Sequence, residues 1–185
     1  MFQPSEKRAG VRGFTIIELL ITFALMVTLV GFIMFPLLNY KNAEEFNTQE
    51  KLMIAMMRDA QQRSIHREQS KRWGVRFTNN VTGDDTFELF KGPSATGGIY
   101  SPCSAITVPT ITSVEKKTLK SSSEFQDPAP GCIKDIVFIS GSGVPVPKEG
   151  STQTINKVII VPKGFTIPPK TIVVYDIGTI DTIEP

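Results

Sequence analysis

The sequence has little excess charge and few of the residues that usually build catalytic sites. Its 20 Lys and Arg residues face 18 Asp and Glu residues, so the formal net charge is only +2. General nucleic-acid binders usually carry a strongly basic domain or stripe, and this balance argues against that class. The single histidine, His66, lies among charged residues, and no Ser or Cys nucleophile can be paired with it from the sequence. We therefore expect no enzyme activity.

Long apolar runs are also absent, with one exception near the N-terminus. The segment 14–38 reads FTIIELLITFALMVTLVGFIMFPLL and holds one ionisable residue, Glu18. As a helix it would span roughly 35–40 Å, which is enough to cross a bilayer. A cleaved secretory signal has a shorter apolar core, followed by a small-residue cleavage site, and no such site precedes Lys41. The sequence predicts a retained transmembrane helix.

Charges on the N-terminal side of this segment predict its orientation. The stretch 1–13 carries Lys7, Arg8 and Arg12 against Glu6 alone. Basic residues favour the cytoplasmic side of a membrane. We expect a single-pass protein of the cytoplasmic (inner) membrane, with its N-terminus in the cytoplasm and the rest of the chain on the periplasmic or extracellular side.

Cysteine is scarce, and the two that occur lie in the part predicted to be outside. Cys103 and Cys132 have no CxxC spacing, so a metal or redox site is not indicated. An extracytoplasmic compartment permits a Cys103–Cys132 disulfide, and two free thiols are the alternative. The turn acids Asp84–Asp85 lack the further spaced carboxylates of a calcium site. The sequence therefore predicts no metal and no cofactor.

The periodicity after residue 38 divides the rest of the chain. Apolar and small residues recur at three- and four-residue steps up to Ser64, which predicts that the helix continues as an amphipathic segment over 39–70. Alternating runs at 73–78 and 86–92 predict a hairpin around the turn NNVTGDD. Further strands are expected at 135–140, 157–161, 171–175 and 179–183. The region 92–131 is rich in Ser, Thr, Pro and Gly, and we expect an irregular excursion with short strands at most near Ile99 and Ile106.

These segments predict an α+β fold in which one long N-terminal helix packs on a mostly antiparallel β-sheet. The expected organisation has four parts: a leader at 1–13, a transmembrane helix at 14–38, its amphipathic continuation at 39–70 and an extracytoplasmic β-rich domain at 71–185. The first half of the helix lies in the membrane, and the apolar stripe of the second half covers the sheet.

Glu18 is the residue in the apolar segment that physics singles out. A bare carboxylate deep in a bilayer costs on the order of a few kcal/mol and needs a partner or a proton. Two interpretations are open from the residues alone. Glu18 either has a functional partner within the membrane or lies shallow enough to reach the lipid headgroups.

The string GFTIIELL at 13–20 resembles the class III signal of type IV prepilins and type II secretion pseudopilins. The resemblance implies that a prepilin peptidase cuts after Gly13 and N-methylates Phe14. It implies that Glu18 sets the register between subunits by compensating the N-terminal amine of an adjacent chain. The expected partners are other pilin or pseudopilin subunits, the prepilin peptidase and an inner-membrane assembly platform.

The stretch RDAQQRSIHREQSKRWGVRFT…FELFKG resembles the GspH/FimT class of minor pseudopilins and minor pilins. DNA-binding members of that class use a basic tail, whereas this tail carries Asp176, Asp181 and Glu184 and no arginine. The sequence thus predicts a minor filament subunit that does not bind nucleic acid. Two alternatives remain: a membrane-anchored extracytoplasmic binding module and a DNA-binding minor pilin of a competence system.

Overall fold

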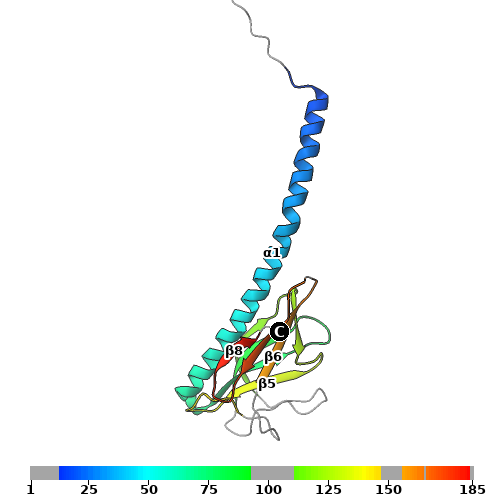
Figure 1. Ribbon diagram of the computed structural model, residues 1–185. Coiled ribbons are helices and arrows are strands. Elements are labelled where there is room, and N and C mark those ends of the chain that lie inside the picture. The colour runs from blue at the N-terminus through cyan, green and yellow to red at the C-terminus, as the bar shows by residue number, and fades with distance from the viewer. Residues whose placement is uncertain (1–12, 93–110, 147–155, 165, 184–185) are drawn as a thin grey trace, which may run out of the picture. The chain divides into compact units, whose positions relative to one another are not determined.

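The computed structural model describes residues 13–92, 111–146, 156–164 and 166–183. One long helix, α1 (Ile16–Ile65), is followed by a short 3-10 turn, η1 (Glu68–Ser70), and by two antiparallel β-sheets. Figure 1 shows the strands gathered against the second half of α1. The α+β class predicted from the sequence is confirmed. The chain divides into two units, residues 1–40 and 41–185, and the boundary between them falls inside α1.

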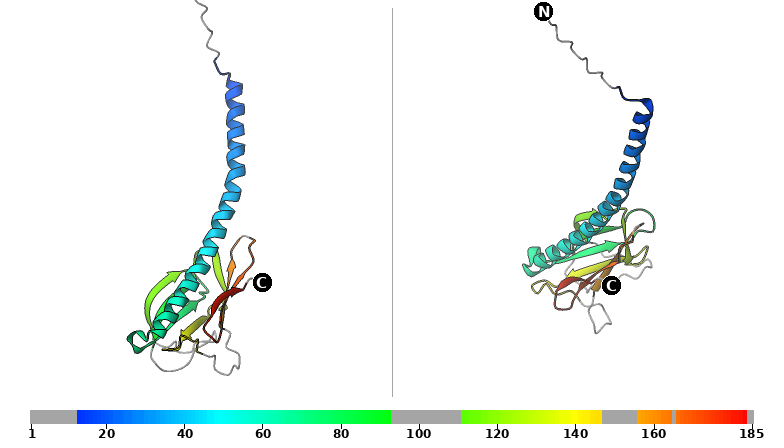
Figure 2. Two further views of the ribbon diagram at one scale, coloured as in Figure 1. Left: turned by 60° about the vertical axis from the view of Figure 1, so that its left-hand side comes forward. Right: turned by 45° about the horizontal axis from the view of Figure 1, so that its top comes forward.

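The second half of α1 packs on the sheets through the stripe that its sequence predicts. Phe46, Met53, Met57, Ala60 and Ser64 are all fully buried. These positions are three, four or seven residues apart, so they lie on one side of the helix. Both views in Figure 2 show this part of α1 lying along the strands. A buried ion pair between Glu50 of α1 and Lys170, the first residue of β7, also joins the helix to the strands.

The first sheet, sheet A, contains the predicted hairpin. Its strand order is β3-β2-β1-β5, and every neighbouring pair is antiparallel. Val75 lies opposite Leu89 and Phe77 opposite Phe87 in the hairpin register, so the alternating apolar residues share one face. The strands of sheet A are β1 (Arg72–Thr78), β2 (Thr86–Gly92), β3 (Thr112–Thr118) and β5 (Ile133–Phe138).

The second sheet, sheet B, has the order β4-β6-β7-β8 and is also antiparallel throughout. Its strands are β4 (Ser123–Asp127), β6 (Asn156–Pro162), β7 (Lys170–Val174) and β8 (Ile180–Ile183). The Phe77 ring of sheet A meets the Phe125 ring of sheet B edge-on, with the ring centroids 5.7 Å apart. Side chains of α1, sheet A and sheet B therefore share one core.

Two expectations about the strands need correction. The single predicted sheet is two sheets, because strand periodicity shows which face is buried but not which strand is the neighbour. The region 92–131, expected to be irregular, contains β3 and β4. Nearly every residue of β3 is exposed, so no apolar alternation marks it. The short strands expected near Ile99 and Ile106 lie outside the described residues.

Candidate functional site

The segment 13–18 begins α1 and carries the residues that the sequence singles out. Gly13, Phe14 and Thr15 precede the helix, and all three are exposed. The Glu18 amide donates a hydrogen bond to Thr15 Oγ1 at 3.3 Å, and the Leu19 amide donates to the Thr15 carbonyl at 3.2 Å. Thr15 is therefore the N-cap of α1. The peptide bond between Gly13 and Phe14 lies just outside the helix, in backbone that an enzyme can reach.

Glu18 has a local role that the sequence analysis missed. It is the third residue of α1, and Thr-x-x-Glu is the spacing of a capping box. A carboxylate in the first turn also interacts favourably with the free amides at a helix N-terminus. The signal was present in the string T-I-I-E. Its side chain is exposed, and no basic side chain within the described residues lies at ion-pair distance from it.

The large apolar side chains that follow Gly13 are exposed in the described structure. From Phe14 to Leu38, every large apolar side chain with a described burial is at least 53% exposed. Within the described part of the chain, α1 is the helix long and apolar enough to span a membrane, and none of its most apolar 18-residue window is buried. The Thr22 hydroxyl donates a hydrogen bond to the Leu19 carbonyl, so its proton is paired within the helix and tolerates an apolar environment. This surface suits lipid or neighbouring helices.

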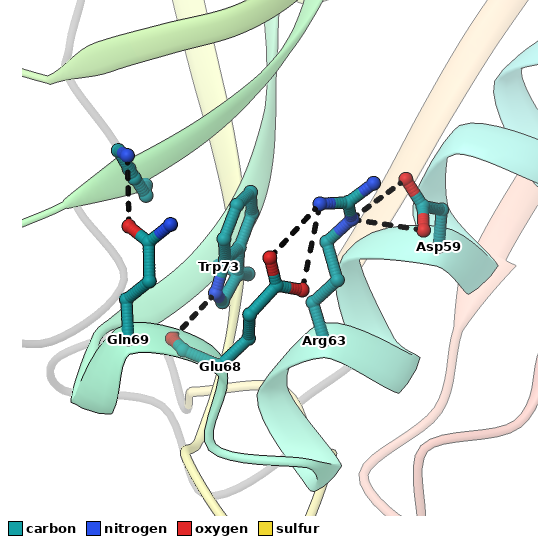
Figure 3. Close-up of polar contacts among 6 residues, drawn as sticks. Asp59, Arg63, Glu68, Gln69 and Trp73 are labelled. Atoms are coloured by element: carbon teal, nitrogen blue, oxygen red, sulfur yellow. Dashed lines mark hydrogen bonds and ion pairs between the residues drawn. The ribbon is translucent and has the colours of Figure 1, made fainter.

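The end of α1 carries a polar cluster around one guanidinium (Figure 3). Arg63 donates from Nε to both Asp59 carboxylate oxygens at 3.0 Å and from Nη1 to Glu68 at 3.3 Å. Its guanidinium carbon lies 4.8 Å from the ring centroid of Trp73, whose indole donates to the Glu68 carbonyl. The hydrogen bond to Asp59 raises the pKa of Arg63, and burial opposes this effect. Arg63 thus fastens the helix end to sheet A.

The cluster occupies part of the basic stretch 63–72. The Arg63 side chain is 33% exposed and pairs with both Asp59 and Glu68. The turn that follows has positive φ at Arg67, Gln69 and Ser70, and Lys91 of β2 donates to Gln69 Oε1 at 2.8 Å. His66 is exposed. The cluster joins secondary-structure elements and has no nucleophile.

Asp85 and Cys132 are the other described candidates for metal or disulfide chemistry. Asp85 is buried and accepts hydrogen bonds from the backbone amides of Asn80 and Phe125, so both of its carboxylate oxygens are occupied. Among the described residues, no group of three or more His, Cys, Asp or Glu side chains is placed to hold a metal. Cys132 is buried and disulfide-bonded. Cys103, its predicted partner, lies outside the described residues, so the pairing stays a prediction.

Comparisons with protein-family models, with curated proteins and with solved structures gave no match. Three features of the chain bear on its function. They are the exposed Gly13–Phe14 peptide, the capped helix start with Glu18 in its first turn and the exposed apolar surface of the first half of α1.

Proposed function

We propose that this chain is a minor pilin or pseudopilin, a subunit of a type IV pilus-like or type II secretion filament. It is made as a precursor and held in the cytoplasmic membrane by the first half of α1. A prepilin peptidase cuts after Gly13 and N-methylates Phe14. The unit 41–185 lies on the periplasmic or extracellular side. The chain is a substrate of the peptidase and has no catalytic role of its own.

One observation carries this proposal. An exposed apolar surface begins at Phe14, directly after an accessible Gly–Phe peptide, and has Glu18 as its lone ionisable residue. A secretory signal is cut after its apolar core, and the core is lost from the mature protein. A cut after Gly13 would come before the apolar core and would keep the helix in the mature chain. The retained surface can be buried between helices of neighbouring subunits.

Glu18 has a defined task in such an assembly. Cutting after Gly13 creates a positive amine on Phe14 at the start of the helix. The Glu18 carboxylate has no basic partner among the described residues, and it can pair with that amine on a neighbouring subunit. In a bundle of low dielectric this attraction depends strongly on distance, and an unpaired charge is costly. The pair therefore fixes the axial stagger between adjacent helices.

A membrane-anchored binding module is the second candidate, and a cleft in the described structure favours it. The cleft measures about 420 Å³ and lies between the β1–β2 turn, β4 and the end of β6. Asn80, Glu124 and Lys163 contribute polar groups to its wall. Glu124 and Lys163 pair with each other at 3.0 Å. This candidate predicts that residues 1–13 stay attached.

The proposal is tested by blocking the cut. We expect Gly13→Leu to leave the chain in the membrane fraction with its leader attached and to remove it from sheared filaments. Gly10→Leu, which changes another glycine of the leader, should be processed and incorporated normally. Incorporation of the Gly13→Leu chain at the wild-type level would contradict the proposal.

A further inference from the structure

The apolar surface of α1 ends at an aromatic residue followed by a basic one. Tyr40 is 68% exposed, and Lys41 beside it is exposed as well. Among the described residues, no ion pair includes Lys41. A tyrosine places its ring in hydrocarbon and its hydroxyl in the headgroup layer, and a lysine extends its ammonium group from an apolar stem toward lipid phosphates. The two side chains therefore suit the boundary where a helix leaves a bilayer.

Glu18 marks a corresponding boundary at the start of the helix. The sequence from 19 to 39 holds no Asp, Glu, Lys, Arg or His. The hydroxyls of Thr22 and Thr28 each donate to a backbone carbonyl of α1 at 2.9 Å. These protons are paired inside the helix, so both threonines tolerate hydrocarbon. The segment between Glu18 and Tyr40 thus contains no charge that must reach water.

The distance between these two boundaries matches the thickness of a bilayer. Position 40 lies 22 residues beyond position 18, which is roughly 33 Å of helix at about 1.5 Å per residue. The hydrocarbon core is about 30 Å thick, and a tilt near the usual ~20° brings the two lengths together. Counted from residue 14, the same helix would measure roughly 39 Å. Residues 14–18 therefore extend beyond the core when residue 40 lies at its outer edge.

We propose that Tyr40 and Lys41 bind the headgroup layer of the outer leaflet and thereby set the depth of α1 in the membrane. The ammonium group of Lys41 lies among lipid phosphates. Glu18 and the Gly13–Phe14 peptide then lie in the headgroup layer of the inner leaflet, where a peptidase reaches the peptide. The Glu18 carboxylate is solvated before assembly and meets a neighbour's amine only in the filament. The inference rests on the proposed function and names lipid headgroups as the partner of Tyr40 and Lys41.

Depth is measured on the full precursor, made without peptidase and reconstituted in vesicles of phosphatidylcholine and phosphatidylglycerol. Tryptophan fluorescence is quenched by lipids brominated either near the headgroup or near the chain end. Tyr40→Trp and Leu19→Trp place a probe at each boundary, and Leu29→Trp places one midway. Trp73 is buried in the folded unit, so the wild-type chain gives the constant background. At positions 40 and 19 we expect lipids brominated near the headgroup to quench at least about twofold more strongly. Position 29 should show the reverse order.

Charge reversal tests whether Lys41 binds the headgroups. In the Tyr40→Trp chain, Lys41→Glu should lower quenching by the lipids brominated near the headgroup by about half, because lipid phosphates repel a carboxylate. The emission should also move to longer wavelength as the probe meets more water. Lys51→Glu makes the same change in net charge at an exposed lysine about 15 Å farther along α1, and it should change neither reading.

Two results would overturn the inference: stronger quenching near the chain end at position 40 or 19, or a signal at position 40 that Lys41→Glu does not change. The Tyr40→Trp vesicles are also treated with prepilin peptidase, and the N-terminus of the chain is sequenced. A chain that is cut to start at Phe14 and gives either result contradicts this inference alone. A chain that does not enter the vesicles, or that keeps residues 1–13 after treatment, contradicts the proposed function, and the inference then falls with it.

Discussion

At the scale of single residues, Glu18 combines a local and an intermolecular role. Its amide is capped by Thr15, and its carboxylate stands in the first turn of a helix, which stabilises that end. The same carboxylate has no basic partner among the described residues. The local role explains why a glutamate is tolerated at the start of an apolar helix. The proposed pairing with a neighbour's amine explains what the charge does in a filament.

These two roles can be separated by substitution. We expect Glu18→Ala to leave membrane insertion unchanged and to lower filament incorporation by at least about tenfold, equivalent to about 1.4 kcal/mol. Thr15→Ala removes the cap but keeps the charge, so it should be incorporated nearly normally. The readout is the amount of chain in membranes and in sheared filaments. Normal incorporation of Glu18→Ala would contradict the proposed role of Glu18 in setting the register between subunits.

The buried pair Arg76–Asp135 shows what residue-by-residue analysis of the sequence did not find. Arg76 donates from Nε and Nη2 to the two carboxylate oxygens at 2.7 Å, across opposed positions of β1 and β5. Burial raises the pKa of Asp135, and the hydrogen bonds from Arg76 counteract this effect. The available signal was the presence of charged residues inside two apolar strands: Arg76 in WGVRFT, and Lys134 and Asp135 in IKDIVF. Their pairing depends on strand order, which the sequence does not reveal.

Breaking this pair should be costly. We expect Asp135→Asn to lower the free energy of unfolding by about 3–5 kcal/mol, because it leaves a buried guanidinium without its counter-charge. Glu124→Gln, which breaks the exposed pair with Lys163, should cost at most about 1 kcal/mol. Urea unfolding of the full chain in detergent can be followed by the fluorescence of Trp73, the single and fully buried tryptophan. An equal loss of unfolding free energy in the two variants would contradict the stabilising role given to the buried Arg76–Asp135 pair.

At the scale of elements, the sequence predicts the helices and strands whose apolar residues recur with a regular period because one set of them is buried. The stripe of α1 is its buried face, and the alternating apolar residues of β1 and β2, such as Val75 and Leu89, are buried in the core. Strand β3 has neither pattern, because it is an exposed edge strand with charged residues in its middle. The division into two sheets also had no signal. It depends on contacts such as Phe77–Phe125, which join segments far apart in sequence.

Gly74 marks a place where two strands and a ring crowd together. A Cβ at this position would lie 2.6 Å from the Ile136 carbonyl oxygen and 3.0 Å from Cζ of Phe90. We expect Gly74→Ala to cost about 1–3 kcal/mol of stability, since backbone must move to admit the methyl group. At Gly92, on the partner strand β2, the nearest such contact is an ordinary 3.6 Å. Gly92→Ala should therefore be nearly neutral in the same unfolding assay, and a reversed order would contradict the packing described.

At the scale of the whole molecule, the chain contains two units with opposite surfaces. The unit 41–185 buries a shared core of helix and two sheets, as a folded domain does on its own. The first half of α1, which precedes this unit, exposes its large apolar side chains from Phe14 to Leu38 wherever their burial is described. A chain so divided needs a second environment for its first unit. Under the proposed function, a bilayer surrounds this unit before assembly and neighbouring helices surround it after assembly.

The most direct test of this account is the mass and N-terminal sequence of the mature protein, made with and without prepilin peptidase. The proposed function predicts a mature chain that begins at N-methylated Phe14 only when the peptidase is present. Without the peptidase, the chain should keep residues 1–13 and stay in the membrane fraction. An intact leader in the presence of active peptidase, or a cut after residue 38, would contradict the filament proposal.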